Sequence, residues 1–452
     1  MNETRQLADY IADFDVAEVP AEVIDKAKLH LLDQIGCQMA FATLPWGKAA
    51  CRYALADGAR GDSTIAYYGA RTSMEKAAFA NGLFGHGFEM DDDDESSTSH
   101  PGVCVIPAAL AVGERVLASG QDVLGAIIVG YDVMIRCAHA ARKMHERHFH
   151  ETAAAGTFGA TAAAAKLLGL SADQVANALG IAASESSGIT EHTCTGGSVK
   201  RVNAGLAASN GVRAALLAQL GITGPTEALE GRKGWIRAFA DDEECDPAKL
   251  VEGLGADYKI MQVGMKPYCC CAGMHGAIDA AEKIRRRGVT ADDIASVAVM
   301  MRPRETRDIG GTVEPQDITQ AQFSAQFGVA LRLVRGSNGF YDYTMEAVGD
   351  PAVRELCRNI IWEVDEDDTY LAGSAAPARV TVTLKDGTVY QETVNNARGT
   401  LGNPIGWDGT IEKFLDLERG CVPDEQARAL VAAVRSLDAS PDIIRLTSLM
   451  TA

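Results

Sequence analysis

The residues best suited to chemistry in this 452-residue chain lie between His86 and His100. Six acidic side chains and two imidazoles fall within these fifteen residues, and four of the acids, Asp91 to Asp94, are consecutive. Carboxylates this close repel one another, which raises the pKa of some of them, and neighbouring imidazoles suit proton transfer near neutral pH. The stretch therefore predicts general acid and base chemistry.

Two other interpretations of this stretch are open. Asp and Ser favour turns and helix N-caps, so the run could be a solvated loop that caps the next helix. Carboxylate oxygens also bind hard cations, but the calcium-loop spacing D-x-[DN]-x-[DN]-G is missing, because Ser96 stands where the glycine is needed.

A second candidate lies at the start of an alanine-rich helix expected after Gly196 and Gly197. Lys200 and Arg201 fall in its first turn, where the helix dipole favours anions over cations. Such a placement points to function, since free backbone N–H groups and the two cations would together bind an anion.

Three histidines, His145, His148 and His150, have the spacing H-x-x-H-x-H. On a helix only the first two share a face, so a three-histidine metal site requires the chain to leave the helix there. The alternative is that protonated histidines complement the dipole at a helix C-terminus.

The run Lys266-Pro267-Tyr268 precedes three consecutive cysteines, Cys269 to Cys271, and then His275. Adjacent cysteines seldom bridge one another, and three in a row do not match zinc spacing. A buried small hydrophobe is the simplest role for Cys271, and an N-terminal packing residue of a helix is an alternative for His275.

Composition excludes several classes of function. The net charge of −19 argues against binding to nucleic acid or to an anionic membrane, but it permits a small anionic substrate in a cleft that gathers a few cations. The eleven cysteines show no CxxC pair, the start lacks a basic leader, and no apolar run reaches membrane-spanning length, so we expect a cytoplasmic protein with reduced thiols. Phosphate loops, dinucleotide fingerprints and nucleophile elbows are absent from the sequence.

The periodicity of apolar residues predicts helices for most of the chain up to about residue 260. Strand patterns then occur at Ile294 to Met301 and in a hairpin from Arg379 to Val394, where Asp386-Gly387 supplies the turn. A helical tail follows. The sequence thus predicts a mainly α protein that contains a smaller α+β domain.

Taken together, the motifs resemble the MmgE/PrpD family, which contains 2-methylcitrate dehydratase, cis-aconitate decarboxylase and iminodisuccinate epimerase. They are Asn81-Gly82 with His86 and the acidic run to His100-Pro101, Phe149-His150 followed by GTFGATAAAAKLLGL, Ser198 to Gly205 (SVKRVNAG), Lys266-Pro267-Tyr268 to His275, Gln322 to Phe327 (QFSAQF), and Arg398-Gly399 with Asn403-Pro404 and Lys413-Phe414. The resemblance covers nearly the whole chain.

The resemblance implies a large all-helical domain built from both chain ends, residues 1–268 and 396–452, and an α+β lid domain over residues 269–395. It also implies a homodimer whose active site lies in the cleft between domains and works without metal or organic cofactor. Carried over from relatives, His150 would move a proton or a leaving group, and Lys200 and Lys266 would bind carboxylates and stabilise an enediolate.

Four positions depart from the pattern that the resemblance implies. Glu89 stands where an Asp is expected, Asp93 where a Thr is expected, Cys271 where the decarboxylase has His, and Phe327 where a Tyr is expected. Cys271 could act as a second base if Lys266 stabilises its thiolate. Two bases on opposite faces of one carbon would epimerise, whereas one base with one acid would eliminate water or another group.

The expected function is a cofactor-independent lyase of the hydro-lyase type that acts on a small di- or tricarboxylate. The alternatives are an epimerase or isomerase, a decarboxylase that uses the same carbanion, an inactive relative that binds a metabolite, and, last, a metal hydrolase. The predicted catalytic residues are His150, Lys200, Lys266, His100, Glu89, Asp93 and Cys271. The predicted substrate-binding residues are Lys200, Arg201, Lys266, His275 and Asp91, and no metal ligands are predicted.

Overall fold

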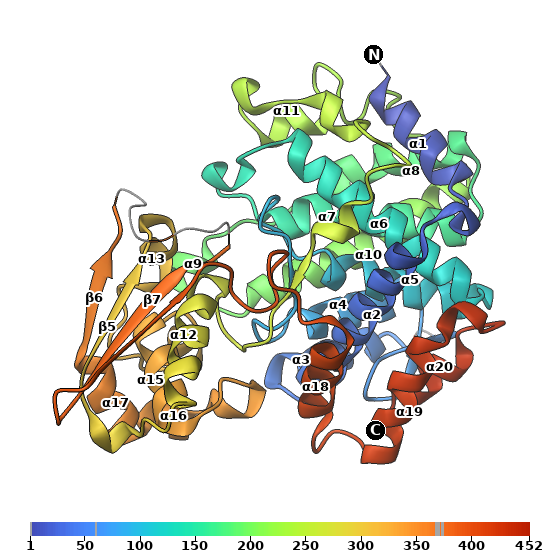
Figure 1. Cartoon of the computed structure of the whole chain (residues 1–452). Coiled ribbons are helices and arrows are strands. Elements are labelled where there is room, and N and C mark those ends of the chain that lie inside the picture. The colour runs from blue at the N-terminus through green and yellow to red at the C-terminus, as the bar shows by residue number, and fades with distance from the viewer. Residues whose placement is uncertain (1, 59–60, 367–370, 372–374) are drawn as a thin grey trace. The chain divides into compact units, whose positions relative to one another are not determined.

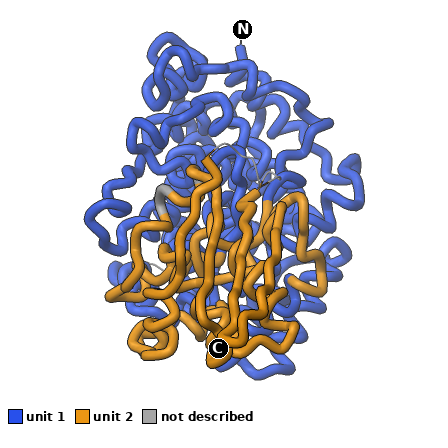
Figure 2. Tube along the Cα trace, turned by 60° about the vertical axis from the view of Figure 1, so that its left-hand side comes forward, with its two compact units in different colours: residues 1–87, 91–263, 410–452 blue, residues 88–90, 264–409 orange. Residues whose placement is uncertain are grey.

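The computed structural model describes residues 2–58, 61–366, 371 and 375–452. Helices dominate these residues and only one sheet has more than two strands, so the mainly α prediction is confirmed. The chain divides into two compact units, coloured separately in Figure 2. Unit 1 comprises residues 1–87, 91–263 and 410–452, and unit 2 comprises residues 88–90 and 264–409. The edges of these units differ from the predicted domain boundaries, which lie at residues 268/269 and 395/396.

Unit 1 is helical, and Figure 1 labels most of its helices. They are α1 (Glu3–Asp13), α2 (Ala21–Ala42), α3 (Pro45–Leu55), α4 (Met74–Gly85), α5 (Gly102–Val116), α6 (Gly120–Ala140), α7 (Glu151–Leu167), α8 (Ala172–Glu185), α9 (His192–Thr195), α10 (Val199–Gln219), α11 (Trp235–Phe239), α19 (Asp424–Arg435) and α20 (Ile444–Leu449). Helix α18 (Gly406–Glu418) begins in unit 2 and continues into unit 1.

Small residues let the central helices of unit 1 approach closely. Helix α7 packs against α5, α6 and α10, and its residues from Glu151 to Ala165 are buried on every side. A Cβ added at Gly159 would lie 2.7 Å from Met134 Cβ and 2.8 Å from the Gly130 carbonyl oxygen. Glycine is therefore needed inside this helix, although it lowers helix propensity.

Helix α6 corrects one expectation. It is long and apolar enough to span a membrane by length and composition, whereas we expected no apolar run of that length. Within the structure 94% of its apolar window is buried, and it packs against α2, α5 and α7. Helix α6 is therefore a core helix of unit 1, and its apolar residues contact other helices.

Unit 2 contains a four-stranded sheet in the order β6-β5-β7-β8. The strands are β5 (Ile294–Met301), β6 (Ile360–Val364), β7 (Ala378–Leu384) and β8 (Val389–Val394); β5 pairs parallel with β6 and antiparallel with β7. The predicted hairpin is confirmed, because β7 and β8 pair antiparallel across Asp386-Gly387, where Gly387 has φ +89°. Helix α12 (His275–Arg285) packs on β7 and β8 and against α15 (Ala325–Arg335) (Figure 1).

The remaining helices of unit 2 are short. They are α13 (Pro303–Ile309), α14 (Ile318–Gln322), α16 (Met345–Gly349) and α17 (Pro351–Arg358). Ser324 and Asp350 cap the N-termini of α15 and α17, which separates these helices from α14 and α16.

Candidate functional site

The acidic segment, residues 86–100, lies between the end of α4 and the start of α5, and most of its carboxylates and His86 are buried. Asp91, Asp92 and Asp94 are 0%, 2% and 1% exposed, and only Asp93 is half-buried. The interpretation as a solvated loop is therefore wrong. Three of the four aspartate side chains stay in the interior because each finds polar partners there, which is the condition for burying carboxylates.

Asp91 forms the centre of the segment. Its Oδ2 lies 2.8 Å from His86 Nδ1 and 3.2 Å from His100 Nδ1. His100 Nδ1 also donates a hydrogen bond of 2.5 Å to the Asp92 carbonyl oxygen, and Asp93 Oδ1 lies 3.8 Å from the same nitrogen. Because Nδ1 carries the hydrogen, Nε2 is the basic nitrogen of a neutral His100 ring.

His150 joins this cluster from the N-cap of α7. Its ring stacks on His86 at 5.7 Å between centroids, and His86 lies 5.1 Å from His100. His192 meets the other side of His150 at 5.6 Å, and the Asn203 amide nitrogen lies 3.4 Å from His150 Nδ1. Four histidines, of which the first and the last lie more than a hundred residues apart in the sequence, thus come together in unit 1.

The electrostatic surroundings of His150 keep it neutral. Burial lowers its pKa well below the ordinary 6.5, and nearby His86, Lys200 and His100 lower it further. A neutral buried imidazole is suited to accept a proton.

A layer of hydrogen bonds fixes Asp92 beneath this cluster. Its carboxylate accepts bonds from the Gly102 N–H at 3.0 and 3.1 Å and from the Tyr131 hydroxyl at 2.7 Å. His30 Nδ1 lies 3.4 Å from Asp92 Oδ2. Burial raises the pKa of Asp92 to about 6, although Tyr131 opposes that shift. Asp92 therefore anchors the segment to α5 and α6.

Lys200 and Arg201 fall in the first turn of α10, as predicted, but with different surroundings. Lys200 is half-buried and acts electrostatically on His150. Arg201 is buried; its Nε donates to the Gly87 carbonyl oxygen at 2.8 Å, and its guanidinium lies 4.1 Å from the centroid of the Trp46 ring. These contacts of Arg201 hold the start of the acidic segment in place.

Unit 2 carries the other predicted residues. Lys266 Nζ lies 3.8 Å from Glu89 Oε2, and both side chains are buried. Glu89 adopts φ +57°, a conformation that residues other than glycine rarely take. Removing the Glu89 carboxylate would take a neighbouring anion away from the buried Lys266 ammonium group, which would destabilise that buried charge.

The three cysteines of unit 2 differ in accessibility. Cys269 and Cys270 are buried, and burial raises the pKa of Cys270 to about 12. Cys271 is partly exposed, so the interpretation as a fully buried hydrophobe fits its two neighbours and not Cys271 itself. His275 begins α12, as expected; it is buried, and its Nε2 lies 3.3 Å from the Cys270 carbonyl oxygen.

The H-x-x-H-x-H histidines do not converge on a metal site. His145 Nδ1 lies 2.8 Å from a Glu151 carboxylate oxygen, His148 has φ +66°, and His150 belongs to the imidazole cluster. Across the described part of the chain, no group of three or more His, Cys, Asp or Glu side chains is arranged to hold a metal ion.

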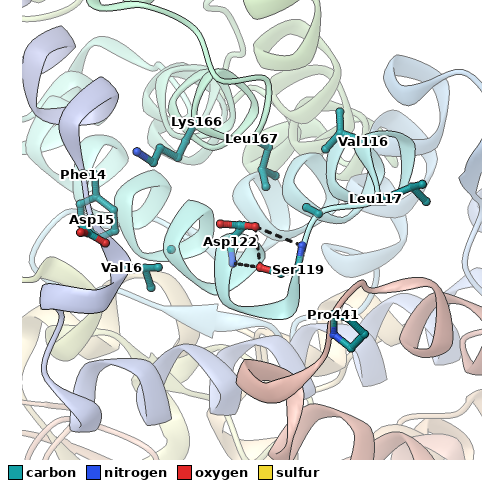
Figure 3. Close-up of a pocket in the computed structure, with 12 residues that line it drawn as sticks. Phe14, Asp15, Val16, Val116, Leu117, Ser119, Asp122, Lys166, Leu167 and Pro441 are labelled. Carbon is teal, nitrogen blue, oxygen red and sulfur yellow. Dashed lines mark hydrogen bonds between the residues drawn. The ribbon is translucent and has the colours of Figure 1, made fainter.

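Two cavities in unit 1 lie outside the cluster. One, of about 670 Å³, is shown in Figure 3, where Asp122 and Ser119 cap α6. Lys166, which also lines it, donates to a backbone carbonyl of α1. Another, of about 490 Å³, is lined in part by residues 96–98 and Glu151. None of the predicted site residues lines either of these two cavities.

Comparison with known proteins now decides the family. Residues 5–248 match the MmgE/PrpD N-terminal domain and residues 268–439 match the MmgE/PrpD C-terminal domain. The chain belongs to the MmgE/PrpD family. The resemblance seen in the sequence motifs is thereby confirmed.

Three curated members of the MmgE/PrpD family show how far the similarity extends. The chain is 27% identical to the cis-aconitate decarboxylase-like protein oryM of Aspergillus oryzae, over 100% of this chain and 97% of the relative. It is 26% identical to the cis-aconitate decarboxylase of Homo sapiens, over 99% and 94%. It is 26% identical to the 2-methylcitrate dehydratase of Salmonella typhimurium, over 94% and 92%.

The structure of this MmgE/PrpD member adds residues that our predicted site omits. His86, His192 and Asn203 contact the cluster directly, and Asp92 and Tyr131 support it. His86 and Asp92 could have been included from their place in the acidic segment, and Asn203 from the motif Ser198 to Gly205. His192 and Tyr131 carry no local signal, because they approach the site only through tertiary packing.

Proposed function

We propose that this MmgE/PrpD protein is a lyase of the hydro-lyase type that removes a proton next to a carboxylate of a small di- or tricarboxylic acid, without a metal or organic cofactor. The observation that carries the proposal is the buried cluster of His86, His100 and His150 around Asp91. Such a cluster offers a base and an acid within one site, as elimination requires.

The proposed mechanism uses the two imidazoles in different roles. Neutral His150 takes the proton from the carbon, and Lys200 binds a carboxylate and stabilises the resulting enediolate. A carboxylate 3.2 Å away favours the protonated form of His100, which then gives its proton to the departing hydroxyl group. The carbon–oxygen bond breaks, a double bond forms, and water leaves.

Decarboxylation is the second candidate, and the extent of similarity favours it. The cis-aconitate decarboxylases align with 99–100% of the chain, whereas two of the three 2-methylcitrate dehydratases align with only 60% and 62%. In that reaction a carbon–carbon bond breaks, carbon dioxide leaves, and His100 gives a proton to the carbanion. The same acid serves both reactions.

Epimerisation remains a third candidate because Cys271 is partly exposed. A second base there would return the proton to the opposite face of the carbon. Phe327 stands where a Tyr is expected and has no hydroxyl group to donate a proton. Because elimination needs a proton donor for the departing hydroxyl group, elimination is tested directly.

The test is a panel of small carboxylic acids, including 2-methylcitrate and cis-aconitate, incubated in D₂O with chelator-treated protein and followed by proton NMR. New vinyl signals without added metal would support a lyase, and carbon dioxide release measured in parallel would distinguish decarboxylation from loss of water. Deuterium uptake without a new product would indicate an epimerase. No change with any acid, or activity that is lost in chelator, would contradict the proposal.

A further inference from the structure

The smaller cavity of unit 1 adjoins the acidic segment, and the proposed mechanism does not use it. Its volume of about 490 Å³ is enough for a small organic or inorganic ligand. Residues 96–98 form part of its wall, and the rest comes from the end of α6, residues 141–145, the start of α7 and residues 249–259. Apart from two alanines, every residue of the lining has a polar side chain. The cavity is therefore suited to a polar ligand and not to an apolar one.

Cations outnumber carboxylates in this lining, although the chain as a whole has 61 acidic and 42 basic residues. The charged residues that line the cavity are Arg142, Lys143, Lys249, Lys259, Glu151 and Glu252. Cations gathered in a concave site attract anions even on a protein of negative net charge. The cavity therefore favours an anionic ligand.

Solvent-accessible ion pairs hold these cations in the structure. Lys143 Nζ lies 2.9 Å from Glu244 Oε1, and Lys249 Nζ lies 2.6 Å from Glu252 Oε2; the two lysine side chains are 45% and 41% exposed. Arg142 Nε lies 3.8 Å from Glu244 Oε2, beyond hydrogen-bond distance, and its side chain is 62% exposed. Exposed ion pairs contribute little to stability, so these cations can turn toward a ligand at little cost.

The two carboxylates of the lining already have partners. Glu151 begins α7 and is buried, and its Oε1 lies 2.8 Å from His145 Nδ1. Glu252 is the partner of Lys249 and is exposed, so its side chain can turn into solvent when the lysine turns toward a ligand. Neither carboxylate therefore excludes an anion from the cavity.

Hydrogen bonds join the wall of the cavity to His100. Ser97 Oγ lies 2.6 Å from Ser99 Oγ, and the backbones of Ser99 and Asp94 exchange two hydrogen bonds of 2.8 and 3.2 Å. The His100 N–H donates to Thr152 Oγ1 at 3.2 Å, in the first turn of α7. A ligand that binds between residues 96–98 and the start of α7 would thus contact both groups of atoms that hold the His100 backbone.

We propose that this cavity binds a small multivalent oxyanion, a polycarboxylate or a phosphate compound, and that its occupant acts on the position of His100. Arg142, Lys143 and Lys249 pair with the charges of the anion, and the exposed hydroxyl group of Thr98 donates a hydrogen bond to it. Binding does not depend on the proposed function. Only its consequence for turnover rests on that function.

The test measures binding of inorganic pyrophosphate and of citrate, each by itself, to the full-length protein by isothermal titration calorimetry. We expect saturable binding in the wild-type protein. In the Arg142→Met/Lys143→Met variant the Kd should rise by about ten- to a hundredfold, because charge-assisted contacts are lost. Lys249→Met, on a different segment, should weaken binding in the same direction and replaces the double variant if that variant does not fold.

A matched control is the Arg115→Met/Arg213→Met variant, which also loses two cations of unit 1. Arg115 Nε lies 3.4 Å from Asp62 Oδ2 and Arg213 Nε lies 2.9 Å from Glu185 Oε1, and neither arginine lines the cavity. Its Kd should equal that of the wild-type protein. An equal loss of affinity in both double variants would mean that only the net charge matters, and the inference would be wrong.

Lys200→Ala distinguishes the cavity from the proposed active site, where the same anions could bind. Binding that is lost in Lys200→Ala and kept in Arg142→Met/Lys143→Met would place the anion at Lys200 and overturn the inference. Binding of citrate alone, or of pyrophosphate alone, in the cavity would support the inference and identify the class of oxyanion. Absence of binding by both anions at millimolar concentrations would contradict it.

The action on His100 is read from ¹³C-labelled histidine by NMR, with His100→Gln to assign its signal. The anion that binds should shift the signals of His145, which lines the cavity, and of His100, and both shifts should be absent in Arg142→Met/Lys143→Met. A His145 signal that moves while the His100 signal stays in place would contradict the action on the acidic segment. None of these measurements needs turnover, so failure of the proposed function would appear only in the test with carboxylic acids in D₂O.

Discussion

At the scale of single residues, the site separates two imidazoles by their surroundings. His150 is buried among other imidazoles and near Lys200, which holds its pKa well below 6.5. His100 instead faces the Asp91 carboxylate at 3.2 Å. In the proposed mechanism the neutral ring of His150 accepts a proton and His100, beside the carboxylate, donates one, which is the usual arrangement of an acid and a base in one site.

Replacing His150 tests the first of these roles. We expect His150→Gln to lower kcat by about two to four orders of magnitude, the usual contribution of a general base, because the amide cannot take up the proton. Steady-state kinetics and a thermal melt would be measured together. His148→Gln is a suitable control, since His148 is exposed and only two residues away. Equal, mild losses in both variants would place His150 among packing residues.

Asp92 predicts a pH dependence of stability. Burial raises its pKa from 3.8 to about 6, so the folded protein binds this proton more tightly than the unfolded chain does. Stability conferred by the protonated form is therefore lost as pH rises from about 4 through about 6. The loss is on the order of 1–3 kcal/mol, from about 1.4 kcal/mol per pKa unit.

Asp92→Asn cannot lose that proton and isolates the effect. The difference in unfolding free energy between wild-type protein and this variant should shift in favour of the variant between pH 4.5 and pH 7.5. Denaturant titrations at the two pH values measure it. A difference that stays constant with pH would show that Asp92 does not titrate in this way.

At the scale of elements, the start of α10 is expected to bind a carboxylate of the substrate. Lys200→Ala should raise the apparent KM by about ten- to a hundredfold, because a hydrogen bond to a charged group contributes roughly 1.5–3 kcal/mol. Arg213→Met, on the same helix and paired with Glu185 of α8, should leave KM unchanged. If Lys200→Ala lowers only kcat, the residue acts on the transition state and not on substrate binding.

The packing of α6 on α7 predicts a stability effect. Gly159→Ala should destabilise the protein by about 1–3 kcal/mol, since the added methyl group would overlap Met134 and the Gly130 carbonyl. Gly349→Ala is the control: it ends α16, and an added Cβ there meets nothing within 4 Å. Equal denaturation midpoints for both variants would mean that the helices can separate at little cost.

The elements were largely predictable from the sequence, and their ends less so. Asp386-Gly387 between alternating strands correctly predicted the β7–β8 hairpin, because its turn chemistry is local. Helix α7 runs through Gly159, although glycine normally marks a break in a helix. Close contact with α6 requires glycine at position 159, and no local sequence pattern indicates this requirement.

The site was predictable in part. The acidic segment, His100, His150 and Lys200 were singled out from the sequence, because charge runs and motifs can be read along the chain, and the structure brings them into one part of unit 1. The burial of the acidic segment was not predicted, because the groups that contact the Asp92 carboxylate come from Gly102, Tyr131 and His30, ten to sixty-two residues away in the sequence. Only the tertiary structure shows that these carboxylates lie in the interior.

At the scale of the whole molecule, the homodimer stays a prediction drawn from the family resemblance. Each chain has a mass of 47.8 kDa, so light scattering behind size-exclusion chromatography should give about twice that value. The measurement should be made at moderate salt, because a net charge of −19 on each chain opposes association at low ionic strength. A mass of one chain at micromolar concentration would contradict the dimer.

The central claim is that the buried imidazole cluster moves a proton next to a carboxylate, and solvent deuterium exchange tests it most directly. Wild-type protein, treated with chelator and given a di- or tricarboxylate substrate in D₂O, should introduce deuterium at the carbon beside the carboxylate or release an unsaturated product, as seen by proton NMR. His150→Gln, folded to the same extent, should slow this at least a hundredfold. Exchange at the wild-type rate in His150→Gln would contradict the account.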